Sequence, residues 1–277
     1  HIDLSRAFSD EEFSVLNISM SDNKIWLLGE SKLRYFSTED RLLHQLNLPL
    51  PGRITHTATV GETLYLALDN GELYRYQQQQ LHLLFNTSVT SAIDALFADD
   101  RHVFAAQKNR LWTYDLKQSH LLPWLDLQTF GSGTSVHTMH SAGKNALWLA
   151  GIGFGLAEYR IDTGTLTLYR PTPGMPESLQ DFLTSALYLD NLQNLWVGSV
   201  SFGVFRVPLR HRQVEQFVFA ENNSPAPQRI QLLSASAQGS LLFNDSKQKL
   251  WRWSGNSSES LQDTGMQDVQ KILALAN

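Results

Sequence analysis

Hydrophobic and polar positions along this chain repeat as pairs of short segments. The first segments of the six pairs read KIWLLGE, TLYLALD, HVFAAQK, ALWLAGI, NLWVGSV and SLLFNDS. The second segments read KLRYF, ELYRY, RLWTY, GLAEY, GVFRV and KLWRW. The pairs return at intervals of roughly 40 to 50 residues, and short strands that repeat at this period are typical of a β-propeller, in which each repeat forms one blade.

A strand before each pair and a strand after it complete the repeat. The preceding segments alternate and are rich in small residues, which suits the strand nearest a propeller axis; they cover 16–22, 56–62, 93–99, 137–143, 184–190 and 231–237. The segments that follow, such as LHLLFN, HLLPWLDL and TLTLYRP, are again apolar, and turn sequences such as DNG and DTG separate the strands. We therefore predict an all-β fold, a β-propeller of four-stranded antiparallel blades with six recognisable blades, at about 14–50, 53–88, 89–131, 135–180, 181–228 and 229–270.

The two ends of the chain predict a partial seventh blade. The last residues, 271–277 (KILALAN), resemble the inner strand at 185–191, and residues 1–13 could supply an outer strand of the same blade. Pairing the two ends would cover exposed sheet edges. Two middle strands would still be missing, so either the ring closes in an unusual way or the chain is a piece of a longer receptor. We favour the second interpretation, with 1–277 as a single propeller domain.

One column of large residues predicts the packing between blades. The second strand of each blade carries a large apolar residue at an equivalent position, which would fill the space between neighbouring sheets; these residues are Trp26, Tyr65, Phe104, Trp148, Trp196 and Leu242.

Composition excludes several classes of protein. The chain has 277 residues, 42% of them hydrophobic, with a formal net charge of −5 and no cysteine. The acidic balance argues against a nucleic-acid partner, which needs a clustered basic surface. The absence of cysteine excludes disulfides and thiolate metal sites. No apolar run is long enough to span a bilayer, so we expect membrane attachment only through a segment absent from this chain.

The fourth and fifth repeats resemble a known family. They read NALWLAGIGFGLAEYRIDTG (145–164) and LDNLQNLWVGSVSFGVFRVP (189–208). An Asp, a short turn, Asn-Leu-Trp, a Gly and a glycine-rich turn resemble the two-component-regulator propeller repeat; in the fifth repeat these positions include Asp190, Asn194, Trp196 and Gly198. The first repeat keeps Trp26 but lacks the glycine-rich turn, and the second, third and sixth repeats match only in outline.

The resemblance carries functional expectations. Propellers of that family are extracytoplasmic sensor regions of bacterial membrane signalling proteins, with histidine kinases or diguanylate cyclases as outputs. It implies a periplasmic domain of an inner-membrane protein that forms a homodimer through the full-length receptor. It also implies a small-molecule or oligosaccharide ligand and propellers of seven blades.

Loops at one end of a propeller converge on the axis, and this funnel is the expected ligand site. Phe154 and Phe202 occupy equivalent turn positions, each followed by Gly, and each either packs on a neighbouring blade or faces the funnel. The loops that lead into the inner strands add further polar side chains. The candidate ligand-binding residues are Phe154, Phe202, Ser201, His137, Asp181, Asp69 and Arg229.

Motifs for metal binding or catalysis are weak. His137 and His140 stand at an odd separation and so point to opposite faces of an extended strand, a poor metal pair. The sequence has no G-x-S-x-G motif, and GIGFG at 151–155 lies between two strands instead of opening a helix. We expect no metal, no cofactor and no enzyme activity. Because propellers also host enzymes, convergence of Asp69 and Asp181 keeps a carbohydrate-active enzyme as an alternative.

The sequence thus predicts a non-catalytic ligand-sensing propeller whose ligand binds in the axial funnel. A propeller that binds other proteins is the main alternative, and a large exposed apolar surface would favour it. In the sensor hypothesis the blades stay rigid and the signal travels as a reorientation of receptor subunits.

Overall fold

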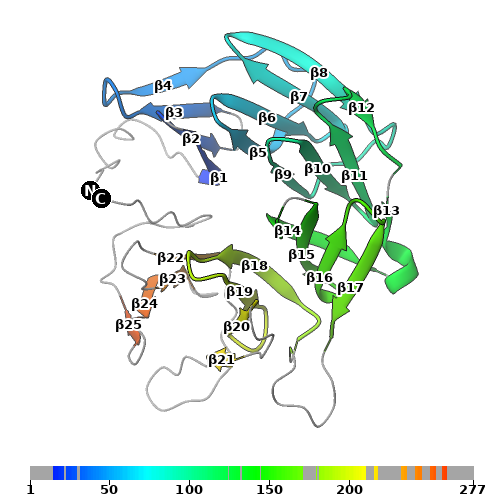
Figure 1. The fold of residues 1–277 in the computed structure, drawn as a ribbon. Helices are drawn as coiled ribbons and strands as arrows, with labels where there is room; N and C mark the ends of the chain where they lie inside the picture. Colours follow the sequence, from blue (N-terminus) through cyan, green and yellow to red (C-terminus); the bar gives the residue numbers. More distant parts are fainter. Residues whose placement is uncertain are drawn as a thin grey trace. The chain divides into compact units, whose positions relative to one another are not determined.

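The structure is a computed structural model that describes residues 15–21, 23–29, 32–123, 125–131, 133–143, 145–170, 179, 181–209, 215–217, 232–235, 241–244, 250–253 and 258–260. The chain divides into two compact units. Unit 1 comprises residues 1–107 and 112–124, and unit 2 comprises residues 108–111 and 125–277. Each unit is built from antiparallel sheets in which strands consecutive in sequence lie side by side (Figure 1).

The first two sheets lie in unit 1 and follow the predicted meander. The strands of the first sheet are β1 (Val15–Met20), β2 (Lys24–Gly29), β3 (Leu33–Ser37) and β4 (Leu43–Leu46). Those of the second are β5 (Ile54–Val60), β6 (Thr63–Leu68), β7 (Glu72–Gln77) and β8 (Gln80–Asn86). The apolar runs of the sequence become the second and third strands, as predicted, because strands that are covered on both faces read as continuous apolar segments.

The third sheet departs from the four-stranded pattern. It contains β9 (Ala95–Ala98), β10 (His102–Gln107) and β11 (Arg110–Asp115), and its outer strand is split into β12 (His120–Leu121) and β13 (Leu125–Asp126), which both pair with β11. Pro123 lies in the gap between the two pieces. Proline has no backbone N–H for a strand ladder and restricts the residue before it, so the predicted continuous strand HLLPWLDL cannot form.

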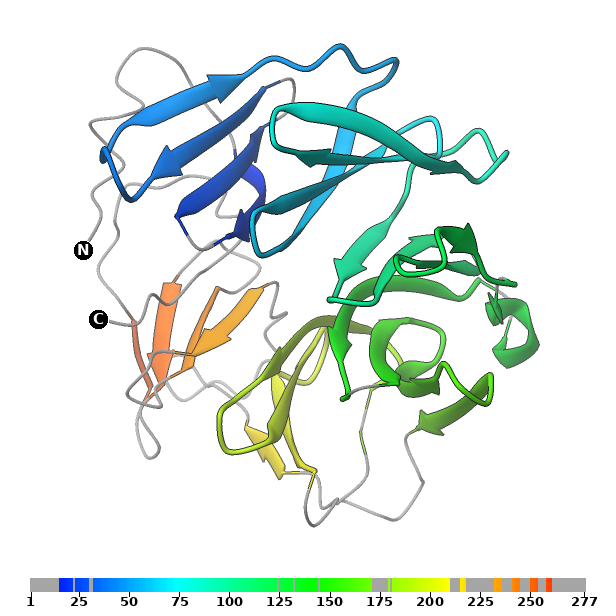
Figure 2. The ribbon, with the colours of Figure 1, turned by 45° about the horizontal axis from the view of Figure 1, so that its top comes forward.

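Unit 2 contains three four-stranded sheets (Figures 1 and 2). The fourth sheet comprises β14 (Ser135–Ser141), β15 (Ala146–Ile152), β16 (Gly155–Arg160) and β17 (Thr165–Tyr169). The fifth comprises β18 (Thr184–Leu189), β19 (Asn194–Ser199), β20 (Val204–Pro208) and β21 (Glu215–Phe217). The sixth comprises β22 (Leu232–Ala235), β23 (Leu241–Asn244), β24 (Leu250–Trp253) and β25 (Ser258–Ser260). A short 3₁₀ helix, η2 (Leu127–Phe130), precedes β14 and is capped by the Asp126 side chain.

The blade count differs from the prediction of six four-stranded blades with a partial seventh. Five of the described sheets are four-stranded, and the third is not. Residues 1–13 and 271–277, on which the partial seventh blade was predicted, lie outside the described residues.

Three residues of the large column, Trp26, Tyr65 and Trp148, pack against a neighbouring sheet, which confirms the packing prediction at these positions. Trp26, Tyr65, Phe104, Trp148 and Trp196 are all buried. In unit 1, Trp26 and Leu28 of the first sheet cluster with Leu64 and Leu66 of the second. In unit 2, Trp148 of the fourth sheet clusters with Leu195, Val197 and Phe205 of the fifth. Burial of such large side chains is the main source of stability for a blade pair.

Candidate functional site

The loops of the fourth and fifth sheets in unit 2 are tied together by one buried threonine. The Thr184 Oγ1 accepts a hydrogen bond of 2.8 Å from the backbone N–H of Gly151 and lies 2.5 Å from the carbonyl oxygen of Gly155. The backbone N–H of Gly153 donates to the carbonyl of Phe182 at 3.1 Å. The turn that follows β15 is therefore fixed against the segment that leads into β18.

Glycines permit this close approach. Gly155 has a φ of +75°, and a Cβ atom there would lie 2.8 Å from the Asp181 carbonyl oxygen. A Cβ on Gly151 would lie 1.9 Å from the carbonyl oxygen of Ser135. The glycine-rich sequence at 151–155 thus serves the contact between strands and loops, and its position between β15 and β16 confirms that it does not open a helix.

Asp181 organises the neighbouring loop instead of facing an open surface. Its side chain is buried, and the carboxylate accepts hydrogen bonds from the backbone N–H of Leu183 at 2.9 Å and of Ser201 at 3.2 Å. The Ser199 hydroxyl also donates to this carboxylate and accepts from the backbone N–H of Phe202 at 2.8 Å. Asp181 is therefore a positioning residue, because one carboxylate oxygen holds the segment before β18 and the other holds the turn after β19.

Three apolar side chains are exposed on these fixed loops. The exposed fractions are 37% for Ile152, 44% for Phe182 and 42% for Phe202. We call these three residues the loop surface. Phe154, at the turn position equivalent to Phe202, is only 1% exposed. The structure thus separates the two residues: Phe154 is buried inside the unit, whereas Phe202 is partly exposed.

The remaining predicted residues fall in different places. His137 is exposed on β14, where its Nε2 lies 3.2 Å from the Ser135 hydroxyl. Asp69 belongs to unit 1, where its carboxylate accepts a hydrogen bond of 3.0 Å from the Arg53 backbone N–H and lies 3.8 Å from the Arg53 Nε. Arg229 lies outside the described residues. Asp181 and Asp69 therefore belong to different units, and each carboxylate is engaged with its own loop.

Two members of the loop surface, Ile152 and Phe182, were missed by reasoning from sequence. Ile152 stands at the end of a continuous apolar strand, where its exposure cannot be distinguished from burial by periodicity. Phe182 directly follows Asp181, whose carboxylate caps the loop. An apolar residue next to such an Asp in a loop was the sequence signal that could have indicated an exposed Phe182.

The Asp-Asn-Leu-Trp motif of the fifth sheet proves to be a structural device. The Asp190 carboxylate accepts four hydrogen bonds: from the backbone N–H groups of Leu192 and Asn194, from the Asn194 amide at 2.8 Å, and from the Trp196 Nε1 at 2.9 Å. Burial raises the pKa of Asp190, but these hydrogen bonds outweigh it, so the pKa lies below its ordinary value. In the fourth sheet Ala142 takes the position of Asp190, and the buried Trp148 Nε1 has no hydrogen-bond partner among the described residues.

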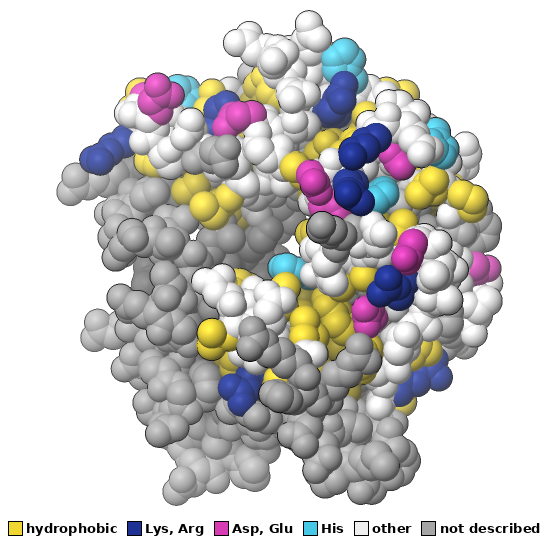
Figure 3. Space-filling view, viewed as in Figure 1, with side chains coloured by type: hydrophobic (Ala, Val, Ile, Leu, Met, Phe, Trp, Pro, Cys, Tyr) yellow, Lys and Arg dark blue, Asp and Glu magenta, His cyan; other side chains and the backbone are white. Residues whose placement is uncertain are grey.

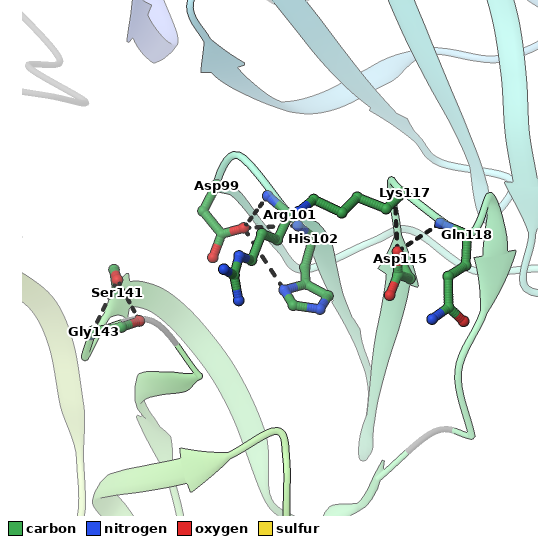
Figure 4. Close-up of polar contacts among 8 residues, drawn as sticks. All are labelled: Asp99, Arg101, His102, Asp115, Lys117, Gln118, Ser141 and Gly143. Atoms are coloured by element: carbon green, nitrogen blue, oxygen red, sulfur yellow. Dashed lines mark hydrogen bonds and ion pairs between the residues drawn. The ribbon is translucent and has the colours of Figure 1, made fainter.

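The same turn position in the third sheet carries another Asp. The Asp99 carboxylate accepts hydrogen bonds from the backbone N–H groups of Arg101 at 2.8 Å and His102 at 2.7 Å, while Asp115 caps the next turn of this sheet (Figure 4). The backbone hydrogen bonds to Asp115 lower the pKa of its carboxyl group. These charged side chains stabilise turns, which is the usual role of Asp at such positions.

The described charged side chains form no large patch of one sign on the face drawn in Figure 3, where basic and acidic side chains are interspersed. Within the described part of the chain, no three His, Cys, Asp or Glu side chains group closely enough to hold a metal ion. Burial lowers the pKa of His140, whose Nδ1 lies 3.1 Å from the Ser141 carbonyl oxygen. None of the described helices is long and apolar enough to cross a membrane.

Comparison with solved structures shows a β-propeller fold. The chain is similar to the WD40 repeats of RRP9, with a TM-score of 0.68 and 11% sequence identity over 91% of this chain and 80% of that one. It is also similar to the computationally designed Ika8 protein, with a TM-score of 0.63, 12% identity and coverage of 91% and 74%. At these identities the likeness shows the fold and does not carry function.

A further similar structure comes from a signalling protein. It is the extracellular domain of BT4673 from B. thetaiotaomicron, described as a one-component or hybrid two-component system. The TM-score is 0.57 at 15% identity, and the match covers 91% of this chain but only 36% of that domain. The chain thus spans about a third of the length of this relative. No protein-family model matches the sequence, and no curated protein matches it.

Proposed function

We propose that this chain is a non-catalytic, ligand-sensing propeller from the extracytoplasmic, periplasmic part of a bacterial membrane signalling protein. Two observations support the proposal. The sequence of the fourth and fifth repeats resembles the two-component-regulator propeller repeat, and the fold is similar to the extracellular domain of BT4673. The output module would be a histidine kinase or a diguanylate cyclase, and the receptor would act as a homodimer.

The proposed binding role rests on one observation: the exposed apolar side chains of the loop surface lie on loops whose backbone is held by hydrogen bonds. Exposed phenylalanines normally cost free energy in water, and here two of them are held on loops whose backbone is fixed by Thr184 and Asp181. A preformed surface loses little conformational entropy when a ligand binds. We propose that a small molecule or an oligosaccharide packs against Phe202 and Phe182, with Ser201 and His137 at the side of the site.

A thermal-shift screen tests this role. The intact chain is heated with oligosaccharides, amino acids and small metabolites, and a ligand of the native state raises the melting temperature in a saturable way. Phe202→Ala and Phe182→Ala should each remove the rise. Leu192→Ala is the matched control, because Leu192 is 76% exposed but lies on the β18–β19 turn, away from the loop surface. A rise that survives both phenylalanine substitutions, or that Leu192→Ala also removes, contradicts the proposal.

The second candidate is a propeller that binds another protein, and the same exposed apolar side chains favour it. The two functions differ in whether the loop surface mediates protein association in the absence of a small ligand. If the screen yields no ligand and the intact receptor ectodomain shows concentration-dependent association that Phe202→Ala abolishes, the protein-binding function replaces the sensor function.

A further inference from the structure

The turn between β6 and β7 in unit 1 contains the one Asn-Gly sequence of the chain, at Asn70 and Gly71. An asparagine that precedes glycine is prone to deamidation, because glycine has no side chain to hinder attack by its own backbone nitrogen. In this reaction the Gly71 nitrogen loses its proton and bonds to the Asn70 Cγ, and the side-chain nitrogen leaves as ammonia. Water then opens the cyclic imide and leaves aspartate or isoaspartate at position 70.

The conformation of the turn calls for both residues of this dipeptide. Gly71 has a φ of +85°, and a Cβ there would lie 2.5 Å from the Thr87 Oγ1 and 2.6 Å from the Val89 carbonyl oxygen. A side chain at position 71 would therefore be strained and crowded. The Asn70 Oδ1 accepts a hydrogen bond of 3.1 Å from the backbone N–H of Glu72, the first residue of β7. The turn thus uses a chemically labile pair for conformational reasons.

The attacking nitrogen is held in the closed turn. The Gly71 N–H donates to the Leu68 carbonyl at 3.2 Å, and the Gly71 carbonyl accepts from the Thr87 N–H at 3.1 Å. The peptide groups on both sides of Gly71 are therefore fixed. The nitrogen becomes free to attack only when the hydrogen bond to Leu68 breaks.

The side chain under attack is held as well. The Asn70 Nδ2 donates to the Glu72 Oε2 at 3.1 Å, so both edges of the amide are bound to residue 72. The Glu72 carboxylate also accepts from the Tyr74 hydroxyl at 3.1 Å and from the Asn86 amide at 3.3 Å, which fixes its own position. A hydrogen bond from an amide to a carboxylate is charge-assisted and increases the electron density of the amide. The Asn70 Cγ is therefore a poorer electrophile in the closed turn.

We propose that Asn70 is a latent deamidation site that reacts when the β6–β7 turn opens. In the closed turn, four hydrogen bonds of Asn70 and Gly71 restrain the two reacting groups. Local opening releases both groups together, and a turn can open without unfolding of the whole unit.

The reaction prevents the turn from closing again in its original form. A carboxylate at position 70 would face the Glu72 carboxylate in place of the donated hydrogen bond, and like charges repel. Isoaspartate also adds a methylene group to the main chain next to Gly71, where Thr87 and Val89 leave little space. Deamidation of Asn70 is therefore an irreversible record of turn opening.

Peptide mapping by mass spectrometry tests the proposal on the intact chain incubated at slightly alkaline pH. Trypsin releases residues 54–75 as one peptide in which Asn70 is the only asparagine and glutamine is absent, so conversion of an amide to a carboxylate there reports position 70 alone. Deamidation of the folded chain should be at least about tenfold slower than that of the same chain unfolded in guanidinium chloride. This factor corresponds to an opening free energy of at least about 1.4 kcal/mol.

Glu72→Ala removes the acceptor of the Asn70 amide. It should accelerate deamidation of the folded chain about fivefold, the factor for a hydrogen bond worth about 1 kcal/mol. Tyr74→Phe is the matched control, because it removes another hydrogen bond to the same Glu72 oxygen and leaves the Asn70 amide bound. This variant should deamidate as slowly as the unmodified chain.

The proposal is overturned if the folded and the unfolded chain deamidate at the same rate, or if Glu72→Ala folds and shows no acceleration. It is also overturned if Tyr74→Phe accelerates the reaction as much as Glu72→Ala. Should Glu72→Ala fail to fold, the comparison of the folded and the unfolded unmodified chain decides by itself. The turn lies in unit 1 and the loop surface in unit 2, so the proposed sensor function is tested separately.

Discussion

The Asp190 turn offers the sharpest test of how the fifth sheet is stabilised. In Asp190→Ala, all four hydrogen bonds to the carboxylate are lost. The turn N–H groups and the Asn194 amide can be rehydrated, whereas the buried Trp196 Nε1 is left without an acceptor. A buried donor without a partner costs about 1–3 kcal/mol, and a lost hydrogen bond to a charged group costs a similar amount. We expect the free energy of unfolding to fall by about 2–4 kcal/mol.

The assay is urea unfolding followed by tryptophan fluorescence, with a double-mutant cycle. Trp196→Phe removes the indole N–H but keeps the ring position, so its cost should be smaller in the Asp190→Ala background. A coupling of about 1–2 kcal/mol between the two sites is expected, since they share a hydrogen bond. Asp190→Asn is a useful companion, because it keeps the size of the side chain and removes its charge.

The pH dependence gives an independent check. The folded pKa of Asp190 lies below its ordinary value of 3.8. A depressed folded pKa means that the contribution of this carboxylate is complete above the unfolded pKa and is lost as the pH falls through the folded pKa. The difference between the unmodified chain and Asp190→Ala should therefore be constant near neutral pH and shrink below about pH 4. A loss of less than about 1 kcal/mol at neutral pH, or a coupling of zero in the cycle, would refute the reasoning.

Three further predictions concern other turns. Ala142→Asp should raise the free energy of unfolding by about 1 kcal/mol, because it offers an acceptor to the Trp148 Nε1, which has no partner among the described residues; the gain should vanish in the Trp148→Phe background. The β7–β8 turn holds Gln78 at a φ of 50° and Gln79 at a φ of 62°, so replacing the pair by Asn-Gly should stabilise the chain by about 1 kcal/mol in thermal unfolding, and an unchanged melting temperature would contradict this. Gly155→Ala should lower the free energy of unfolding, measured in urea, by at least about 2 kcal/mol, because Gly155 has a positive φ and a Cβ there would meet the Asp181 carbonyl oxygen. Gly164 also has a positive φ but open space around it, so Gly164→Ala should lower the free energy of unfolding by only about 1 kcal/mol. Equal losses would show that the contact with Asp181 is unimportant.

The sequence by itself determined the architecture of the blades. The strands were predicted from the period of the apolar pairs and the small residues of the inner strands, and the packing between sheets from the large column that includes Trp26 and Trp148. This succeeds because alternation, strand length and turn chemistry are local properties that a short segment carries with it. Pro123 was also visible in the sequence, and its missing N–H explains the split outer strand that was predicted as continuous.

Only the tertiary structure decided which side chains of the candidate site are accessible. Phe154 and Phe202 occupy equivalent turn positions, yet one is buried and the other exposed, because burial depends on the neighbouring loop that each one meets. Asp181 was predicted to face a ligand, and the structure instead shows its oxygens bound to Leu183 before β18 and to Ser201 after β19. A cavity in unit 1 is lined by residues of β2, of β4 and of the segment 47–53 between β4 and β5, and no local pattern reports their convergence. Turn identity is thus encoded locally, whereas the accessibility and partners of a side chain arise from contacts between segments distant in sequence.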